Sequence, residues 1–250
     1  MKGRSMNELP LKMEGVSFHY KAGEAGIDQV GLECSTGSWT AVMGPSGAGK
    51  TTLLYCASGL LPVQQGSVEI AGQNIARMKE SALTRMRRDH MGFVFQDYNL
   101  VEAFTCLQNV MLPQLFGGPK VGVAQSLQAL KILGLDGYAQ QYPSDISGGQ
   151  RQRVAIARAL VAQPDMIFAD EPTGALDTRS SEMVLDALST LVESGRTVLM
   201  VTHDPNVAAW AQRTVFLVDG TVHSICQGYT AEQLSTHLTS MTQVGQGVGR

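Results

Sequence analysis

The stretch from Val42 to Thr52, V-M-G-P-S-G-A-G-K-T-T, constrains this chain more than any other. It fits the phosphate-loop pattern G-x-x-x-x-G-K-[ST], in which glycines allow a tight turn whose backbone N–H groups point inward at a polyphosphate. W-T-A-V-M before it reads as a short buried strand, and T-T-L-L-Y-C-A after it as the start of a helix, whose N-terminus favours anions. The alternative is a glycine-rich turn without a ligand. Four matched positions in fixed order favour a nucleotide site.

The residues of this loop would have different roles. Lys50 can reach the β- and γ-phosphates of a nucleotide, and the Thr51 hydroxyl can take a place on Mg²⁺. The expected nucleotide contacts of the loop are Gly44, Pro45, Ser46, Gly47, Ala48, Gly49, Lys50, Thr51 and Thr52.

Size and composition limit the class of protein. The chain has 250 residues, 44% hydrophobic and 16% charged, enough for one α/β domain and an inserted subdomain. A net charge of −3 gives no electrostatic footprint for nucleic acid. The four cysteines show no C-x-x-C spacing and look like free thiols in a reducing compartment. We find neither a signal peptide nor an apolar run near the roughly 18 residues of a membrane helix. We therefore expect a soluble protein that meets a membrane only through a partner.

Two further side chains become candidate nucleotide or metal contacts only because the chain contains a phosphate loop. Tyr20 ends a partly alternating strand that starts at Leu11, and its ring could stack on adenine. The alternative is a strand-end tyrosine that packs on the sheet. Gln96 follows a strand from Gly92 to Phe95. Its amide is a candidate ligand of Mg²⁺ only if that strand lies beside the strand of the phosphate loop.

The middle of the chain reads as helical. Residues 104–145 contain no strand pattern and break at Gly117 and Gly118. Because this stretch is too long for a connection within a compact domain, it predicts a helical subdomain. The preceding helix, residues 79–90, is basic, and we interpret its arginines as a solvated face. They are Arg85, Arg87 and Arg88.

Residues 146–162 form a glycine-rich turn that opens another helix. Ser147 and the N–H groups of Gly148 and Gly149 would lie at its N-terminus, where they make a second potential phosphate cradle. The alternative is an ordinary serine N-cap. The helical period puts apolar residues on one side and Arg151 and Arg158 on the other. The apolar set is Val154, Ile156, Ala157, Leu160 and Val161.

Acidic and histidine side chains follow two later strands. M-I-F-A-D-E places Asp170 and Glu171 at the C-terminal edge of a sheet, where open α/β sheets bind ligands. Asp170 would hold Mg²⁺ through water, and Glu171 would orient and deprotonate the attacking water. Paired acids at a strand end are often only a solvated turn, but the apolar lead-in favours a site. T-V-L-M-V leads to His203, which could donate a hydrogen bond to the γ-phosphate. A lone histidine is more often structural, so His203 counts only because of its neighbours.

The end of the chain follows simpler patterns. Residues 214–226 predict a hairpin that turns at Asp219 and Gly220. A terminal helix is expected from about Thr230.

Together these motifs resemble the ATP-binding subunit of an ATP-binding cassette (ABC) transporter over about residues 11–226. Two phrases, G-F-V-F-Q-D-Y-N-L and D-E-P-T-G-A-L-D, resemble the bacterial branch that works with MacB/FtsX-type permeases. The departures are Ile146 where leucine is usual and Gly174 where many relatives have serine. The matched motifs are the A-loop (Tyr20), Walker A (Gly44–Thr51), Q-loop (Gln96), signature (Ile146–Gln150), Walker B (Met166–Glu171), D-loop (Gly174–Asp177) and switch histidine (His203).

The resemblance implies an α/β fold of the P-loop NTPase, ABC ATPase type. A RecA-like mixed sheet would form the core, with an antiparallel β subdomain and an inserted α-helical subdomain. The core with the β subdomain would be residues 11–96 and 164–226, and the helical subdomain with the signature would be about 97–163. Residues 1–10 would be a flexible leader, and residues 227–250 a C-terminal helix and flexible tail.

The resemblance also implies the mechanism. Two copies, or a pair of related ABC subunits, would bind two ATP molecules with Mg²⁺ at a head-to-tail interface. Each ATP would lie between Walker A of one chain and the signature of the other, contacted there by Ser147, Gly148, Gly149 and Gln150. Asp177 would couple the two sites. The catalytic residues would be Lys50, Gln96, Glu171 and His203.

ATP hydrolysis would drive a membrane permease of MacB/FtsX type from the cytoplasmic side of the bacterial cell membrane. The work done could be export, lipid or lipoprotein extraction, or antimicrobial-peptide resistance. Two alternatives stay open. One is a mechanotransmission or signalling ATPase without a transported substrate, and the other is a soluble ABC ATPase of the iron–sulfur-assembly type. No nucleic-acid partner is expected.

Overall fold

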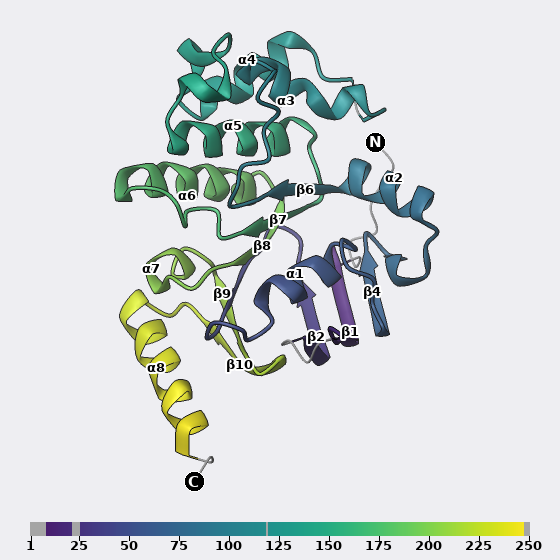
Figure 1. The fold of residues 1–250 in the computed structure, drawn as a ribbon, viewed down its shortest axis with the longest axis vertical. Coiled ribbons are helices and arrows are strands. Elements are labelled where there is room, and N and C mark those ends of the chain that lie inside the picture. Colours follow the sequence, from purple (N-terminus) through teal and green to yellow (C-terminus); the bar gives the residue numbers. More distant parts are fainter. Residues whose placement is uncertain (1–8, 22–25, 119, 248–250) are drawn as a thin grey trace.

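The computed structural model describes residues 9–21, 26–118 and 120–247 (Figure 1). Its larger sheet has six strands in the order β10-β9-β3-β8-β7-β6. β3, β6, β7, β8 and β9 run parallel, and β10 returns antiparallel to β9. Parallel strands deliver their following loops to one edge of the sheet, so loops distant in sequence meet there. The strands are β3 (Trp39–Met43), β6 (Met91–Val94), β7 (Met166–Asp170), β8 (Thr197–Val201), β9 (Arg213–Val218) and β10 (Thr221–Gln227).

A smaller antiparallel sheet has the strand order β2-β1-β4-β5. β2 alternates between buried and exposed residues over much of its length, as expected for a sheet with one wet face. Helix α1 (Lys50–Ala57) follows the phosphate loop, and its buried Leu53 and Leu54 join a core that both sheets share. The strands are β1 (Leu11–Phe18), β2 (Ile27–Cys34), β4 (Gln65–Ile70) and β5 (Gln73–Asn74).

The described residues between β6 and β7 form helices and no strand, and they lie at the top of Figure 1. These are α3 (Cys106–Leu115), α4 (Val123–Ile132), the short turns η2 (Asp136–Tyr138) and η3 (Pro143–Asp145), and α5 (Gly148–Val161). The remaining helices are η1 (Ile75–Arg77), α2 (Glu80–His90), α6 (Thr178–Glu193), α7 (Pro205–Ala208) and α8 (Ala231–Gly247).

Helix α5 differs from the two-sided helix that its sequence predicts. Gln152, Arg153, Ala155 and Ala159 are buried as well as most of the expected apolar residues. The reason is its position: α3, α4, α6 and β6 all pack against it, so more than one side is covered. Neither Arg151 nor Arg158 is fully exposed.

Smaller differences concern the ends of elements. β1 stops at Phe18, two residues before Tyr20, and β6 begins and ends one residue earlier than predicted. Asp219 and Gly220, with φ of 44° and 75°, turn the β9–β10 hairpin as expected. Most of the predicted leader (residues 1–8) and the last residues of the predicted tail (248–250) lie outside the described residues. Within the described part, no helix combines the length and apolar character needed to span a membrane.

Candidate functional site

The phosphate loop is held tightly from outside. Gly49 has a φ of 92°, and a Cβ on it would lie 2.4 Å from the carbonyl oxygen of Gly26, so only glycine fits there. The Ala48 carbonyl accepts a hydrogen bond of 3.1 Å from the N–H of Gly220 in the β9–β10 turn. The loop is therefore braced by the start of β2 and by the terminal hairpin.

Lys50 lies against the loop that precedes it. Its Nζ donates hydrogen bonds of 2.9 Å to the Gly44 carbonyl and 2.8 Å to the Pro45 carbonyl. Burial lowers the pKa of the ammonium group, while the carboxylates of Glu171 and Asp170 act in the opposite direction. The cation is thus placed between the loop and the acidic edge of the sheet.

Thr51 and Asp170 meet across the sheet. Thr51 Oγ1 donates to Asp170 Oδ1 at 3.3 Å, although β8 separates the two strands that lead to them. Burial raises the pKa of the Asp170 carboxyl, and hydrogen bonds from Tyr55 and Thr51 offset this in part. The Thr51 hydroxyl and the buried Asp170 carboxylate are therefore close enough to contact one shared ligand.

This donor set fits Mg²⁺. Mg²⁺ prefers oxygen ligands, keeps several waters, and is typically held by one or two carboxylates together with substrate phosphates. Among the described residues, no group of three or more His, Cys, Asp or Glu side chains forms a cage for a metal ion. A site with so few protein ligands suits a metal ion that binds together with the phosphates of a nucleotide.

Glu171 and His203 come together at the same edge. His203 Nδ1 lies 2.8 Å from Glu171 Oε1, and the side chains are 71% and 17% exposed respectively. Glu171 has a φ of 46°, a conformation that costs a non-glycine residue on the order of 1–3 kcal/mol. Such strain persists where the surrounding structure imposes it; here the Glu171 N–H is fixed by the Val201 carbonyl at 3.0 Å.

The sequence made Gln96 a candidate ligand of Mg²⁺ only if its strand lay beside the strand of the phosphate loop, and this condition is not met. β6 does not lie beside β3, because β7 and β8 stand between them. β6 pairs instead with β7, whose end carries the acidic residues. Gln96 Nε2 lies 3.7 Å from the position that a Cβ on Gly174 would take, and Glu171 Cβ is 3.6 Å from the same position. The amide therefore approaches the acidic edge through a strand pairing that the sequence did not reveal.

Tyr20 lies against the phosphate-loop helix. Its hydroxyl is 3.4 Å from Thr52 Oγ1, and its ring meets Phe18 edge-on at 4.9 Å. Tyr20 therefore lies at the rim of the site, where its ring packs against Phe18 of the smaller sheet.

The second cradle is formed by the turn that opens α5, packed against the start of α6. Ser147 caps α5 in a reciprocal pair with Gln150, whose side chain accepts from the Ser147 N–H at 2.7 Å. Asp177 caps α6 by accepting from the Ser180 N–H at 2.9 Å. Gly149 packs on Ser180, since a Cβ on it would lie 2.5 Å from Ser180 Oγ. Among the described residues, no hydrogen bond joins this turn to the phosphate loop.

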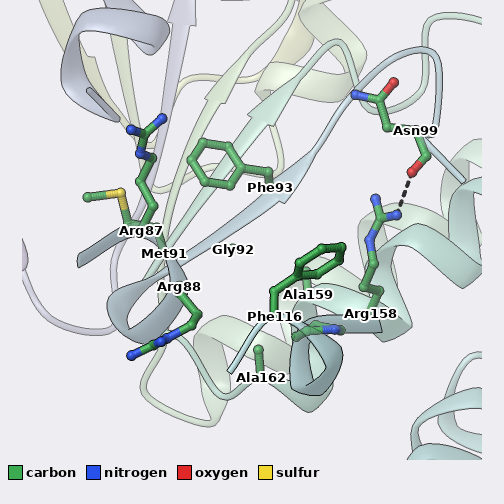
Figure 2. A pocket seen from close by; sticks show the side chains of 11 residues that line it. Arg87, Arg88, Met91, Gly92, Phe93, Asn99, Phe116, Arg158, Ala159 and Ala162 are labelled. Carbon is green, nitrogen blue, oxygen red and sulfur yellow. Dashed lines mark hydrogen bonds between the residues drawn. The ribbon is translucent and has the colours of Figure 1, made fainter. Parts of the chain in front are cut away.

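The sequence interpretation missed two features. Arg87 and Arg88 do not simply face solvent: they line a cavity of about 380 Å³ between α2, β6, α3 and α5 (Figure 2). Arg158 binds backbone carbonyls of the loop after β6. The seven-residue spacing of Arg151 and Arg158, two helical turns, was the signal available for that second feature.

Comparison with known proteins identifies the family. The profile of the family described as ABC transporter matches residues 27–174, more than half of the chain. The chain belongs to the ABC transporter family. The ABC ATPase fold that its sequence predicts is confirmed by solved ABC cassettes.

One of these structures, titled a dimeric structure of MJ0796, a bacterial ABC transporter cassette, is 39% identical with a TM-score of 0.81 and covers 88% of this chain and 99% of its own. Another, of the same cassette in a post-hydrolysis state bound to ADP and Pi, is 38% identical with a TM-score of 0.80 and the same coverage.

Two curated relatives are similar over most of this chain. The ABC transporter ATP-binding protein YvrO of Bacillus subtilis is 43% identical over 215 residues, which are 84% of this chain and 94% of the relative. The macrolide export ATP-binding/permease protein MacB of Photorhabdus laumondii is 42% identical over 224 residues, 88% of this chain. The chain spans about a third (34%) of the length of that MacB protein. These likenesses confirm the predicted ATP-binding subunit of an ABC transporter and are consistent with the MacB branch, and the chain is an ABC-type ATPase that binds ATP.

Proposed function

We propose that two copies of this chain, or one copy and a related subunit, close around two ATP molecules and use hydrolysis to drive a membrane permease of MacB/FtsX type. The observation that carries this proposal is the meeting of Lys50, Thr51, Asp170, Glu171 and His203 at one edge of the sheet. Three separate strands deliver them. In the part of the chain that the structure describes, no hydrogen bond joins the Ser147 cradle to the phosphate loop, and this supports its use by a second chain.

The residues then divide the work of hydrolysis. The phosphate loop holds the β- and γ-phosphates, and Lys50 neutralises them. Thr51 and Asp170, with Gln96 nearby, would hold Mg²⁺, which would supply positive charge to the phosphates. Glu171 orients and deprotonates the attacking water.

His203 and the partner's signature complete the site. His203 donates a hydrogen bond to the γ-phosphate, and Ser147 and Gly149 contact it from the other chain at the positive end of α5. Tyr20 stacks on adenine, and Asp177 couples the two sites. Because the γ-phosphate is bound from both sides, its loss weakens the dimer.

The cavity of Figure 2 supports a permease contact. We name it the arginine groove, formed by Arg87, Arg88, Phe93, Asn99, Phe116 and Arg158. At the C-terminal end of α3 beside it, Leu115 is 65% exposed and the following Phe116 is 74% exposed. An apolar ridge next to cationic side chains suits a short amphipathic segment that carries an acidic residue. MacB relatives named ATP-binding/permease proteins support a permease as its source.

Dimer formation is tested with Glu171→Gln protein, in which slow hydrolysis preserves bound ATP. Light scattering should show a dimer with ATP and a monomer without it. Adding Ser147→Arg should block the dimer while leaving ATP binding intact, because the bulky cation would fill the cradle that this chain offers to the other chain. Ser144→Arg, an equally exposed serine three residues earlier, is the matched control. An ATP-dependent dimer in the Ser147→Arg protein would contradict the arrangement.

The permease contact is tested by purifying the tagged chain from detergent-solubilised bacterial membranes. Mass spectrometry should identify an integral membrane protein with the wild type but not with Phe116→Asp. Ile132→Asp on α4, which alters another exposed apolar residue, should retain it. Recovery of only soluble iron–sulfur-assembly proteins would contradict the permease proposal.

A further inference from the structure

The loop after β6 has an unusual backbone. Tyr98 and Asn99 have φ of 60° and 48°, so two successive non-glycine residues adopt the left-handed conformation. The turn is closed by the Tyr98 N–H bonding to the Phe95 carbonyl at 3.1 Å. Gln96 lies within this turn. A backbone of this kind persists only where other groups hold it.

Arg158 of α5 is the group that holds it. Its Nη2 donates to the Tyr98 carbonyl at 3.0 Å, and its Nη1 donates to the Asn99 carbonyl, the bond drawn in Figure 2. One planar guanidinium thus binds both left-handed residues, which fixes their relative orientation. Burial lowers the pKa of Arg158 to about 10, so the group stays charged at neutral pH.

The Tyr98 side chain meets the other end of the same helix. The guanidinium of Arg151 lies over its ring, 5.3 Å from the centroid, a cation–π contact. The hydroxyl oxygen of Tyr98 is 2.9 Å from the position that a Cβ on Gly148 would take, so this side chain packs against the first turn of α5. Gly148, Arg151 and Arg158 are three and seven residues apart and share one face of the helix.

We propose that Tyr98, Arg151 and Arg158 are positioning residues for ATP hydrolysis, forming a clasp that makes the Gln96 turn and the signature turn move as one unit. Gln96 lies two residues before Tyr98, and Ser147 directly precedes Gly148. A shift of the loop therefore displaces the cradle offered to the second chain. This inference rests on the proposed roles of Gln96 and Ser147, and it adds the connection between them.

The clasp also reaches the arginine groove. Asn99 and Arg158 line that groove, whereas Tyr98 reaches the signature. A segment that entered the groove would meet the outer end of the clasp, and the loop would transmit its position to Ser147. This coupling is a movement of the loop against α5, and no residue has to change its charge for it to occur.

The test uses the isolated full-length chain, without a permease. Arg158→Ala should lower kcat for ATP at least tenfold, while the affinity of the monomer for ATP changes less than twofold. In the Glu171→Gln background it should raise the protein concentration needed for the ATP-driven dimer at least tenfold. Arg158→Lys, which keeps the charge and one donor, should recover part of the kcat.

Arg213→Ala is the matched control, because Arg213 also donates from its side chain to a backbone carbonyl, that of Glu33 at 2.8 Å, in a part remote from the signature. Its kcat should stay within twofold. If Arg158→Ala does not fold, Tyr98→Leu replaces it: the Arg158 bonds to the backbone remain, and the ring contacts with Arg151 and Gly148 are lost. Tyr98→Leu should show the same kcat loss with unchanged ATP affinity.

The outcomes separate the two proposals. If the parent Glu171→Gln protein fails to dimerise with ATP, the proposed dimer mechanism fails, and the kcat values still decide on the clasp. If the parent dimerises while Arg158→Ala, or Tyr98→Leu in its place, keeps wild-type kcat and dimerisation, the clasp is overturned. A loss of ATP affinity equal to the loss of kcat would also overturn it, because it would indicate general damage to the nucleotide site.

Discussion

His203 Nδ1 lies 2.8 Å from Glu171 Oε1, so the imidazole and the candidate base share a hydrogen bond. With Glu171 ionised, the hydrogen sits on Nδ1, and the Nε2 of a neutral ring can only accept. To donate to a γ-phosphate, the ring must either be protonated or release Glu171. Whether Glu171 is free to accept a proton from water therefore depends on where the His203 ring lies.

Glu171→Gln should reduce hydrolysis by about 10²–10⁴-fold, the usual contribution of a general base, with ATP affinity retained. Turnover under saturating ATP measures the loss, and equilibrium binding measures the affinity. Glu193→Gln, the same change at the exposed end of α6, should keep wild-type turnover. Turnover near wild type in Glu171→Gln would rule out the assigned base.

His203→Ala should lower kcat by about 10²–10³-fold, on the scale of a lost donor to developing charge. His203→Gln, whose amide can still donate, should retain more activity than His203→Ala. Steady-state kinetics of both variants give the comparison, with His19→Ala at an exposed histidine as control. Equal activity of the alanine variant and the wild type would remove His203 from the mechanism.

Thr51→Val should raise the Mg²⁺ concentration needed for half-maximal hydrolysis about tenfold or more, the scale on which changes beside a metal alter its affinity. Thr51→Ser keeps the hydroxyl that meets Asp170 and should need little more Mg²⁺ than the wild type. A Mg²⁺ titration at fixed ATP separates them. Identical titrations of the valine and serine variants would exclude Thr51 as a ligand.

Gly148→Ala should destabilise the nucleotide-free protein by about 1–3 kcal/mol, because its Cβ would press on the Tyr98 hydroxyl. Tyr98→Phe should restore much of this loss, since the ring carbon behind the hydroxyl would lie 3.8 Å from that Cβ, an ordinary contact. Denaturant unfolding of the two single variants and the double variant gives the coupling energy. Additive effects would show that the two residues do not touch.

Local patterns predicted the fold well. β3, β7 and β8 are short apolar runs in sequence and fully buried strands in the structure. The phosphate loop and the α5 cap follow rules of spacing and side-chain type, which a sequence displays directly. The prediction that Thr51 and Asp170 serve one metal depends on both loops leaving the same edge of a parallel sheet, and the two side chains do meet there.

What the sequence did not provide depends on which strands and helices become neighbours. The place of β6 beside β7 is a long-range pairing, so the route of Gln96 to the acidic edge could not be read from its own strand. The helical period of α5 was correct, but it does not say how many partners surround the helix. For that reason the period could place Arg158 opposite the apolar side of the helix, but it could not show that the loop after β6 packs against this arginine.

The glycine packing around the phosphate loop has a consequence for how this chain can diverge. Gly26, Gly49 and Gly220 come from three separate segments, and a Cβ on Gly49 or on Gly220 would lie within 2.7 Å of the same carbonyl oxygen, that of Gly26. The obstacle at both positions is main chain rather than a replaceable side chain. A substitution that adds a Cβ at Gly49 or Gly220 would therefore require the backbone at Gly26 to move, so the phosphate loop, the start of β2 and the β9–β10 turn can change only together.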